Sequence, residues 1–145
     1  MKQQELKEAL IHSLSKLYEM KAFAILAQFL QGETQVLFFL SQHWGREINP
    51  SDLSDSLHVS RSRITATLTA LRKKGYVSME LSQEDRRRMS ITLTDAGRSH
   101  IREKQKQVNA YFDQLVEGLG EETTVTLNQI IDQSIRIIST EPKKG

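Results

Sequence analysis

The chain has 145 residues, of which 38% are hydrophobic and 26% charged, and its formal net charge is +2. This composition excludes an intrinsically disordered chain, and the length suits one globular domain. Because the chain has no cysteine, disulfides, thiolate metal sites and cysteine nucleophiles are excluded. No apolar run approaches the roughly 18 residues of a membrane span, and the N-terminal residues lack a secretory signal. We therefore expect a cytoplasmic protein with no membrane partner.

The positive charge is concentrated in the middle of the chain. Residues 61–104 contain eleven Lys or Arg and five Asp or Glu, whereas acidic residues are in slight excess on both sides. A basic segment between mildly acidic ends favours binding of an anion such as nucleic acid. A solvated charged face has the same composition, so charge alone does not separate the two interpretations.

The first element is predicted to be one long helix. Apolar residues recur at spacings of three and four from Leu6 to Phe29, and no Gly or Pro occurs before Gly32. The pattern predicts a helix of about 28 residues, roughly 40 Å long. Such a wide apolar face is longer than a small domain needs, so we expect a partner chain to cover it.

Three shorter helices are predicted next, over residues 33–44, 50–57 and 61–74. The first is apolar on nearly all sides, which is typical of a buried helix, and Gly45 is placed to end it. Asn49 and Ser60 are suitable N-caps for the second and third. Only the tight turn 58–60 separates those two helices.

A β-hairpin and two further helices complete the chain. Apolar and polar residues alternate over 76–82 and 89–94, which predicts two strands joined by a highly charged tip. Thr94 is a suitable cap for a helix that runs to Gly120, and a last Ile-rich helix follows. The tail 141–145 is expected to fray.

Two short helices, a tight turn and a basic hairpin are the pattern of a helix-turn-helix followed by a wing. In the helix 61–74, Ile64, Leu68 and Leu71 fall within about 60° of one another and are predicted to face the core. The opposite side is small, hydroxylated and basic, which suits a helix entering the major groove. An ordinary amphipathic surface helix is the alternative. The predicted DNA contacts are Arg61, Ser62, Arg63, Thr65, Thr69 and Lys73 in this helix and Asp85, Arg86, Arg87 and Arg88 in the wing.

The wing tip is the more specific signal. Three adjacent arginines repel one another and stabilise a fold little, whereas they are strongly attracted to a polyphosphate. We expect Asp85 to orient Arg87 or Arg86, and an arginine at the tip to enter a narrow minor groove. The alternative is a solvated charge run in a mobile loop.

Several motifs resemble the MarR family of winged-helix transcriptional regulators. They are the segments Gly32–Leu37, Leu53–Leu57 with Val59-Ser60, Leu71–Val77, and Asp85-Arg86-Arg87 followed by Ile91–Gly97. The specific part is the wing motif, an Asp with an Arg two residues later, leading into a strand that ends in Leu-Thr-x-x-Gly. The other motifs are shared with many winged helices. The resemblance covers almost the whole chain.

The resemblance implies a mainly α fold with a small β-hairpin wing. A winged helix-turn-helix over 33–97 would be flanked by dimerisation helices over 1–31 and 98–140. It further implies a homodimeric repressor on a pseudo-palindromic operator, with the recognition helix 61–74 in the major groove and the wing 82–89 in the minor groove. Arg87 would be the minor-groove arginine and Asp85 its support.

Many family members respond to phenolic or aromatic acids bound between the dimerisation and DNA-binding regions. We therefore expect a small aromatic or amphipathic acid as effector, with Tyr18, Phe38 and Trp44 as candidate lining residues, although such aromatic residues often belong to the core. No cofactor, metal site or enzymatic activity is expected, because the four His form no close ligand pair and no catalytic motif occurs. A winged-helix protein–protein interaction module and a metal-responsive regulator remain alternatives.

Overall fold

The computed structural model describes residues 2–140 and Pro142, so the tail predicted to fray lies, apart from Pro142, outside the described residues. The described elements are α1 (Gln3–Glu19), α2 (Lys21–Phe29), α3 (Gly32–Gln42), α4 (Pro50–Leu57), α5 (Arg61–Lys73), β1 (Val77–Leu81), β2 (Met89–Leu93), α6 (Asp95–Leu119) and α7 (Glu121–Ile138). The expected fold class, mainly α with one β-hairpin, is confirmed. The chain forms two compact units, Met1–Val108 and Asn109–Gly145, and α6 begins in the first and ends in the second.

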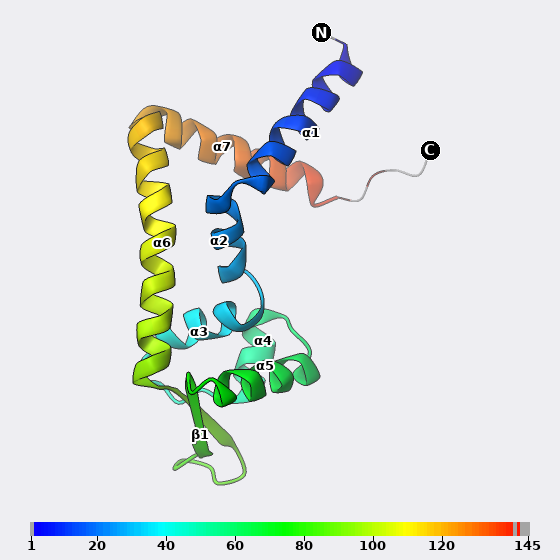
Figure 1. Cartoon of the computed structure of the whole chain (residues 1–145). Coiled ribbons are helices and arrows are strands. Elements are labelled where there is room, and N and C mark those ends of the chain that lie inside the picture. The colour runs from blue at the N-terminus through cyan, green and yellow to red at the C-terminus, as the bar shows by residue number, and fades with distance from the viewer. Residues whose placement is uncertain (1, 141, 143–145) are drawn as a thin grey trace. The chain divides into compact units, whose positions relative to one another are not determined.

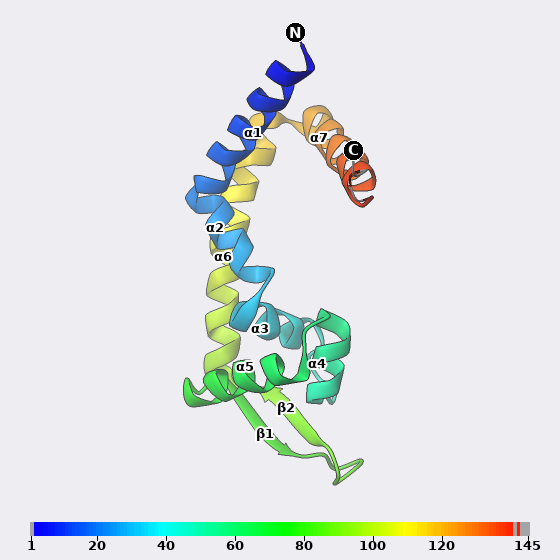
Figure 2. The same ribbon diagram turned by 90° about the vertical axis from the view of Figure 1, so that its right-hand side faces the viewer.

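The core of the first unit lies where α3, α4 and α5 meet the hairpin. Figures 1 and 2 show these three helices gathered together, with the hairpin projecting beyond them. The three apolar residues predicted to face inward from α5 are indeed buried, and Leu53 of α4 and Ile101 of α6 are completely buried beside them. The remaining core residues are Val36, Leu37, Leu40, Ile48, Val77, Ile91 and Leu93.

The helix-turn-helix is fixed by local capping. Asn49 Oδ1 accepts from the Asp52 N–H at 2.9 Å, and Asp52 Oδ2 accepts from the Asn49 N–H at 3.0 Å, so α4 begins with a reciprocal capping box. His58 ends α4 in the left-handed conformation, with φ of 55°. Ser60 then caps α5 by accepting from the Arg63 N–H at 3.3 Å. Both predicted N-caps are therefore confirmed.

The wing is an antiparallel hairpin in which Val77 pairs with Leu93 and Leu81 with Met89. A third segment joins it, because the Ile91 N–H donates to the Ile48 carbonyl at 2.7 Å in an isolated bridge. This bridge, which sequence analysis did not predict, fixes the loop before α4 to the edge of β2.

The expectation of one long first helix is wrong, because the helix breaks at Met20. This residue adopts an extended conformation with φ of −68° and ψ of 139°. It is at once the C-cap of α1 and the N-cap of α2, and its carbonyl accepts from the N–H groups of Phe23 and Ala24. Helix α2 buries Ile25, whereas α1 buries nothing. Burial of Ile25 therefore helps to fix the direction of α2, whereas no buried residue does this for α1. The spacing of apolar residues is the same in both helices and does not predict this difference.

The helix predicted over 33–44 is also shorter than expected. It ends at Gln42, and Trp44, which was predicted to be buried with it, is 51% exposed. The bend after Gln42 turns the chain towards Ile48, and the Trp44 side chain therefore leaves the core.

Two helices expose most of their apolar residues within their own units. In the first unit, α1 exposes Leu6, Leu10, Ile11, Leu14 and Leu17. In the second unit, α7 exposes Val125, Leu127, Ile130, Ile131, Ile135, Ile137 and Ile138. Among the described residues, no single helix is long and apolar enough to cross a membrane, and only α2 and α3, bent by 61°, pass that test as a pair.

Candidate nucleic-acid interface

Helix α5 has a polar face that lies in solvent. The exposed residues Ser62, Thr65, Thr69 and Lys73 fall within an arc of about 80° at 3.6 residues per turn. Arg61 and Arg63, also exposed, lie on either flank of this arc. All six residues predicted as contacts in this helix are therefore exposed, but only Ser62, Thr65, Thr69 and Lys73 lie opposite the three buried apolar positions.

The threonine hydroxyls of α5 are hydrogen-bonded to their own helix. Thr65 donates to the Arg61 carbonyl at 2.9 Å, Thr67 to the Arg63 carbonyl at 2.9 Å, and Thr69 to the Thr65 carbonyl at 2.8 Å. Thr67 was not among the predicted contacts. It lies beside Arg63 on one flank of α5, where both line a cavity of about 280 Å³ shared with α3.

At the wing tip, one carboxylate orients two arginines. Asp85 Oδ1 accepts from the backbone N–H of Arg87 at 3.0 Å and from its Nε at 3.2 Å. Asp85 Oδ2 lies 3.8 Å from Arg88 Nε. The backbone and side-chain hydrogen bonds from Arg87 hold the pKa of Asp85 below its ordinary value of 3.8, with desolvation opposing them and Arg88 adding to them. The Arg87 side chain is nevertheless 91% exposed.

The base of the tip is closed by Ser82, which sequence analysis missed. Its side chain is buried, and Oγ accepts from the N–H groups of Glu84 at 3.2 Å and Asp85 at 3.1 Å. Its own N–H donates to the Arg88 carbonyl at 2.9 Å. A Ser before two polar residues is a known local turn signal, which could have identified it. The tip is thus held by the Ser82 hydroxyl at its start and by the backbone hydrogen bond between Ser82 and Arg88 that joins its two ends.

The C-terminal end of α5 is attached to α3 and α6. Lys74 Nζ donates to both carboxylate oxygens of Glu33, at 2.9 and 3.0 Å. Thr94, the confirmed cap of α6, donates its hydroxyl to the Gly75 carbonyl at 2.6 Å and accepts from the Gly97 N–H at 3.1 Å. These contacts join the start of the wing to the start of α6.

His100 of α6 stacks on Tyr76, with ring centroids 4.5 Å apart. Partial burial holds the pKa of His100 below 6.5, and the charges of Lys104 and Lys74 act in the same direction while Glu33 opposes them. The imidazole is therefore favoured in its neutral form at this junction.

Gly97 allows α6 to approach the wing closely. A Cβ on Gly97 would overlap the Tyr76 carbonyl oxygen and would lie 2.9 Å from its carbon and 3.0 Å from Leu93 Cδ1. The glycine of the Leu-Thr-x-x-Gly motif thus has a steric function.

Two of the aromatic effector candidates lie in different surroundings. Tyr18 lines a cavity of about 390 Å³ together with Phe23 and Glu33. Phe38 instead packs edge-on against Phe29, with centroids 5.4 Å apart, at the margin of the core.

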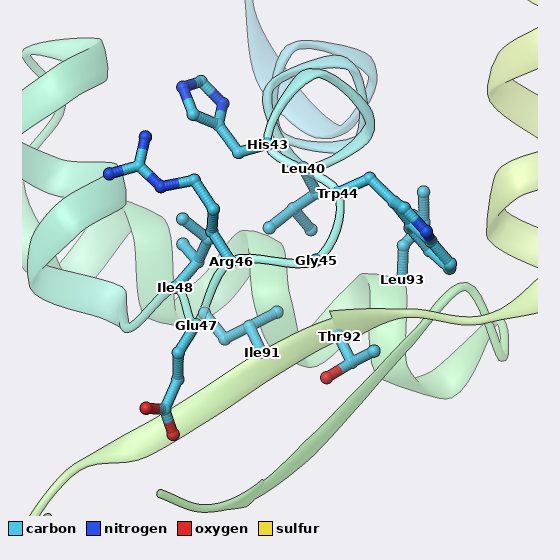
Figure 3. Close-up of a pocket in the computed structure, with 10 residues that line it drawn as sticks. All are labelled: Leu40, His43, Trp44, Gly45, Arg46, Glu47, Ile48, Ile91, Thr92 and Leu93. Atoms are coloured by element: carbon cyan, nitrogen blue, oxygen red, sulfur yellow. The ribbon is translucent and has the colours of Figure 1, made fainter. Parts of the chain in front are cut away.

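The third candidate, Trp44, lines a separate cavity of about 340 Å³ between the end of α3 and β2. Figure 3 shows Trp44 beside Leu93 on one side of this cavity, with His43 and Arg46 on the other. The Arg98 guanidinium lies 4.4 Å from the centroid of the indole ring. The structure therefore does not bring the three aromatic candidates into one cavity. Among the described residues, no group of three or more His, Asp or Glu could hold a metal ion.

Comparison with known proteins gives the family. The profile of the winged helix DNA-binding domain matches residues 33–112. The transcriptional repressor MprA of Escherichia coli strain K12 is 31% identical over 124 residues, which cover 83% of this chain and 69% of MprA. The chain belongs to the MarR family of winged-helix transcriptional regulators. The resemblance based on the wing motif is thereby confirmed.

Two further MarR-type comparisons differ in extent. The regulator PapX of Escherichia coli is 34% identical over 84 residues, which cover 58% of this chain and about half, 51%, of PapX. The structure of the transcriptional repressor CouR bound to a 23-mer DNA duplex has a TM-score of 0.66 at 26% identity. It covers 92% of this chain and 96% of the CouR chain. These relatives are regulators of transcription.

Proposed function

We propose that this chain is a sequence-specific regulator of transcription, and specifically a repressor, that binds double-stranded DNA with α5 in the major groove and the wing 82–89 in the minor groove. The wing tip carries the proposal. Asp85 fixes the direction of an Arg87 side chain that is 91% exposed and contributes nothing to the core. An oriented, exposed guanidinium suits a narrow minor groove, where the negative potential is enhanced.

The exposed face of α5 supports the same docking. Ser62, Thr65 and Thr69 have short side chains, which allow the helix backbone to come close to base edges. Arg61 and Arg63 on the flanks suit phosphates or guanine edges on either side. Phosphate contacts would set the register of the helix in the groove, and the hydroxylated face would read sequence.

We further propose that the functional form is a homodimer built from the segments 1–31 and 98–140. The supporting observation is the row of exposed apolar residues on α1, and a second such row on α7. Exposed apolar surface of this extent in a soluble chain marks an interaction site. A two-fold dimer would read a pseudo-palindrome with half-sites about 10 bp apart. Sedimentation at micromolar concentration should give a dimer, and a monomer would contradict this part of the proposal.

The proposed effector is a small aromatic or amphipathic acid. Of the three aromatic candidates we favour Tyr18, because its cavity holds a second aromatic ring and borders Glu33, whose ion-pair partner Lys74 at the end of α5 supplies the cation that an acid requires. If an incoming acid attracted Lys74, the lysine would leave the carboxylate of Glu33 for that of the ligand. Loss of this ion pair would disturb the position of the recognition helix.

The decisive experiment selects preferred duplexes from a random pool and then titrates variants against the selected operator. Arg87→Ala should weaken binding at least about tenfold and lower the salt slope by about one unit, because a phosphate or minor-groove contact is lost. Arg46→Ala is the matched control. It removes the same charge from an exposed position on the loop before α4, outside α5, the wing and the segments proposed to dimerise, and should bind within about twofold of the parent.

The other outcomes separate the alternatives. Equal affinity of Arg87→Ala and the parent would refute the wing assignment. Failure to enrich any sequence would favour an interaction module that binds protein. Operator binding that requires an added divalent metal would favour a metal-responsive regulator. A thermal-shift screen of phenolic acids, fatty acids and metals, followed by DNA titrations, tests the effector, and hits that leave DNA affinity unchanged would contradict it.

A further inference from the structure

The β-hairpin is longer than the core on which it packs. On the face turned towards the helices, the pair Val77 and Leu93 is buried. Four residues along each strand, on the same face, Leu81 pairs with Met89, and this is the last pair of the hairpin. Leu81 is 62% exposed, although side chains two residues apart in a strand point to the same face. The apolar pattern of the hairpin therefore continues beyond the point where folding can bury it.

The two members of this last pair have different surroundings. Met89 is partly buried and lines a cavity of about 230 Å³ with Asn49 and Asp52 at the start of α4. Leu81 is on β1, the strand that packs against α5, and does not line that cavity. Leu81 is the last residue of β1, so along the hairpin it lies between the part packed against α5 and the arginine tip. Figure 2 shows the hairpin projecting beyond the helices.

We infer that Leu81 packs on the deoxyribose rings of the DNA strand that separates the two grooves, an inference that rests on the proposed function. If α5 occupies the major groove and Arg87 the adjacent minor groove, the sugar–phosphate strand that separates the two grooves must pass beneath the part of the hairpin that lies between α5 and Arg87. Sugar rings are the apolar part of this strand, and a leucine facing them loses its contact with water.

This contact differs in kind from those of the arginines. A leucine displaces no counterion and reads no base edge, so its contribution is independent of operator sequence and of salt. It sets the depth at which the wing sits on the strand. Leu81 is thus a positioning residue, which keeps the arginine tip at the right height over the minor groove.

Three variants test the inference in the full chain. Leu81→Ala removes three carbon atoms from the contact, and should weaken binding about tenfold on the selected operator and on an unrelated duplex alike. Its slope of log affinity against log salt should equal that of the parent. Leu81→Met keeps an apolar side chain of similar volume, and should restore binding to within about twofold. Arg87→Ala, measured beside them, should lower the slope.

The outcomes distinguish this inference from the proposed function. If Arg87→Ala weakens binding and Leu81→Ala does not, the sugar contact is refuted and the wing assignment stands. If Leu81→Ala binds weakly but with a salt slope lowered by about one unit, it acts through the charged tip and the inference is also refuted. If neither variant changes affinity, the proposed function itself fails. Unchanged thermal unfolding of Leu81→Ala is expected because the side chain is exposed, and a large loss of stability would contradict its assignment to DNA.

Discussion

Substituting Gly97 by Ala should destabilise the fold, although the same change in most helices has the opposite effect. An added Cβ would overlap the carbonyl oxygen of Tyr76 and would lie 3.0 Å from Leu93 Cδ1. Both obstacles are hard to move, since the carbonyl belongs to the backbone at the start of the wing and Leu93 is buried. Relief therefore requires α6 to shift away from the hairpin.

The magnitude follows from two opposing effects. Overpacking a filled site lowers the free energy of unfolding by about 1–3 kcal/mol. The loss here should be at the upper end of this range or beyond it, because the added Cβ meets the Tyr76 backbone and not a movable side chain. Replacing a helical glycine by alanine stabilises by about 1 kcal/mol, which offsets part of the cost. We expect a net loss of about 2 kcal/mol. For a chain of this length that corresponds to a fall of roughly 4–8 °C in Tm.

Gly118 provides a matched control in the same helix. A Cβ there would meet nothing within 4 Å, so Gly118→Ala should raise Tm by roughly 2–4 °C. Differential scanning calorimetry of the two variants and the parent at one protein concentration measures both shifts. A Gly97→Ala variant as stable as the parent would refute the close approach of α6 to the wing.

Three further results are expected. Lowering the pH from about 8 to about 5 should lower Tm. Burial holds the pKa of His100 below 6.5, so the unfolded chain gains the proton first and stability is lost as the pH falls below 6.5. His100→Gln should flatten this profile in calorimetry, and an unchanged profile would contradict the assignment. Asp85→Asn should weaken operator binding at neutral pH in fluorescence anisotropy. In the parent, the pKa of Asp85 lies below 3.8, so the carboxylate is charged and supports Arg87 fully above about pH 5. This support is lost only as the pH falls through the depressed pKa. A loss of operator binding near pH 6 that depends on Asp85 would contradict the structure. Lys74→Ala should lower the free energy of unfolding by at most about 1 kcal/mol in chemical denaturation, because its ion pair with Glu33 is half exposed. A loss above about 2 kcal/mol would contradict this weak contribution of an exposed pair.

The parts of the fold that the sequence predicted well depend on residues close together in the chain. Asn49, Ser60 and Thr94 each cap a helix through a backbone N–H three residues later. The contact between Asp85 and Arg87 likewise spans two residues. Such interactions are determined by the local segment, and the residue pattern is sufficient to identify them.

The missed features depend on packing between distant segments. The break at Met20 has no Gly or Pro to signal it, and follows from the packing of α2 on the rest of its unit. The bridge from Ile48 to Ile91 joins residues far apart in sequence. Tyr18, Phe38 and Trp44 were chosen for residue type and helix position. They lie in different surroundings because nothing in their spacing encodes whether each one reaches a cavity or the core.

The hydrogen bonds that Thr65 and Thr69 make to their own helix limit which bases α5 can recognise. A hydroxyl has one hydrogen, and here each is engaged by a carbonyl four residues earlier. Towards the groove these side chains offer only oxygen lone pairs and a methyl group. Lone pairs accept from the amino groups of adenine and cytosine, and a methyl packs against the methyl of thymine, whereas the acceptor edge of guanine requires a donor. If α5 lies in the major groove as proposed, the operator should therefore have adenine, cytosine or thymine beneath the threonines, with guanine at positions within reach of the donors Arg61, Ser62, Arg63 and Lys73.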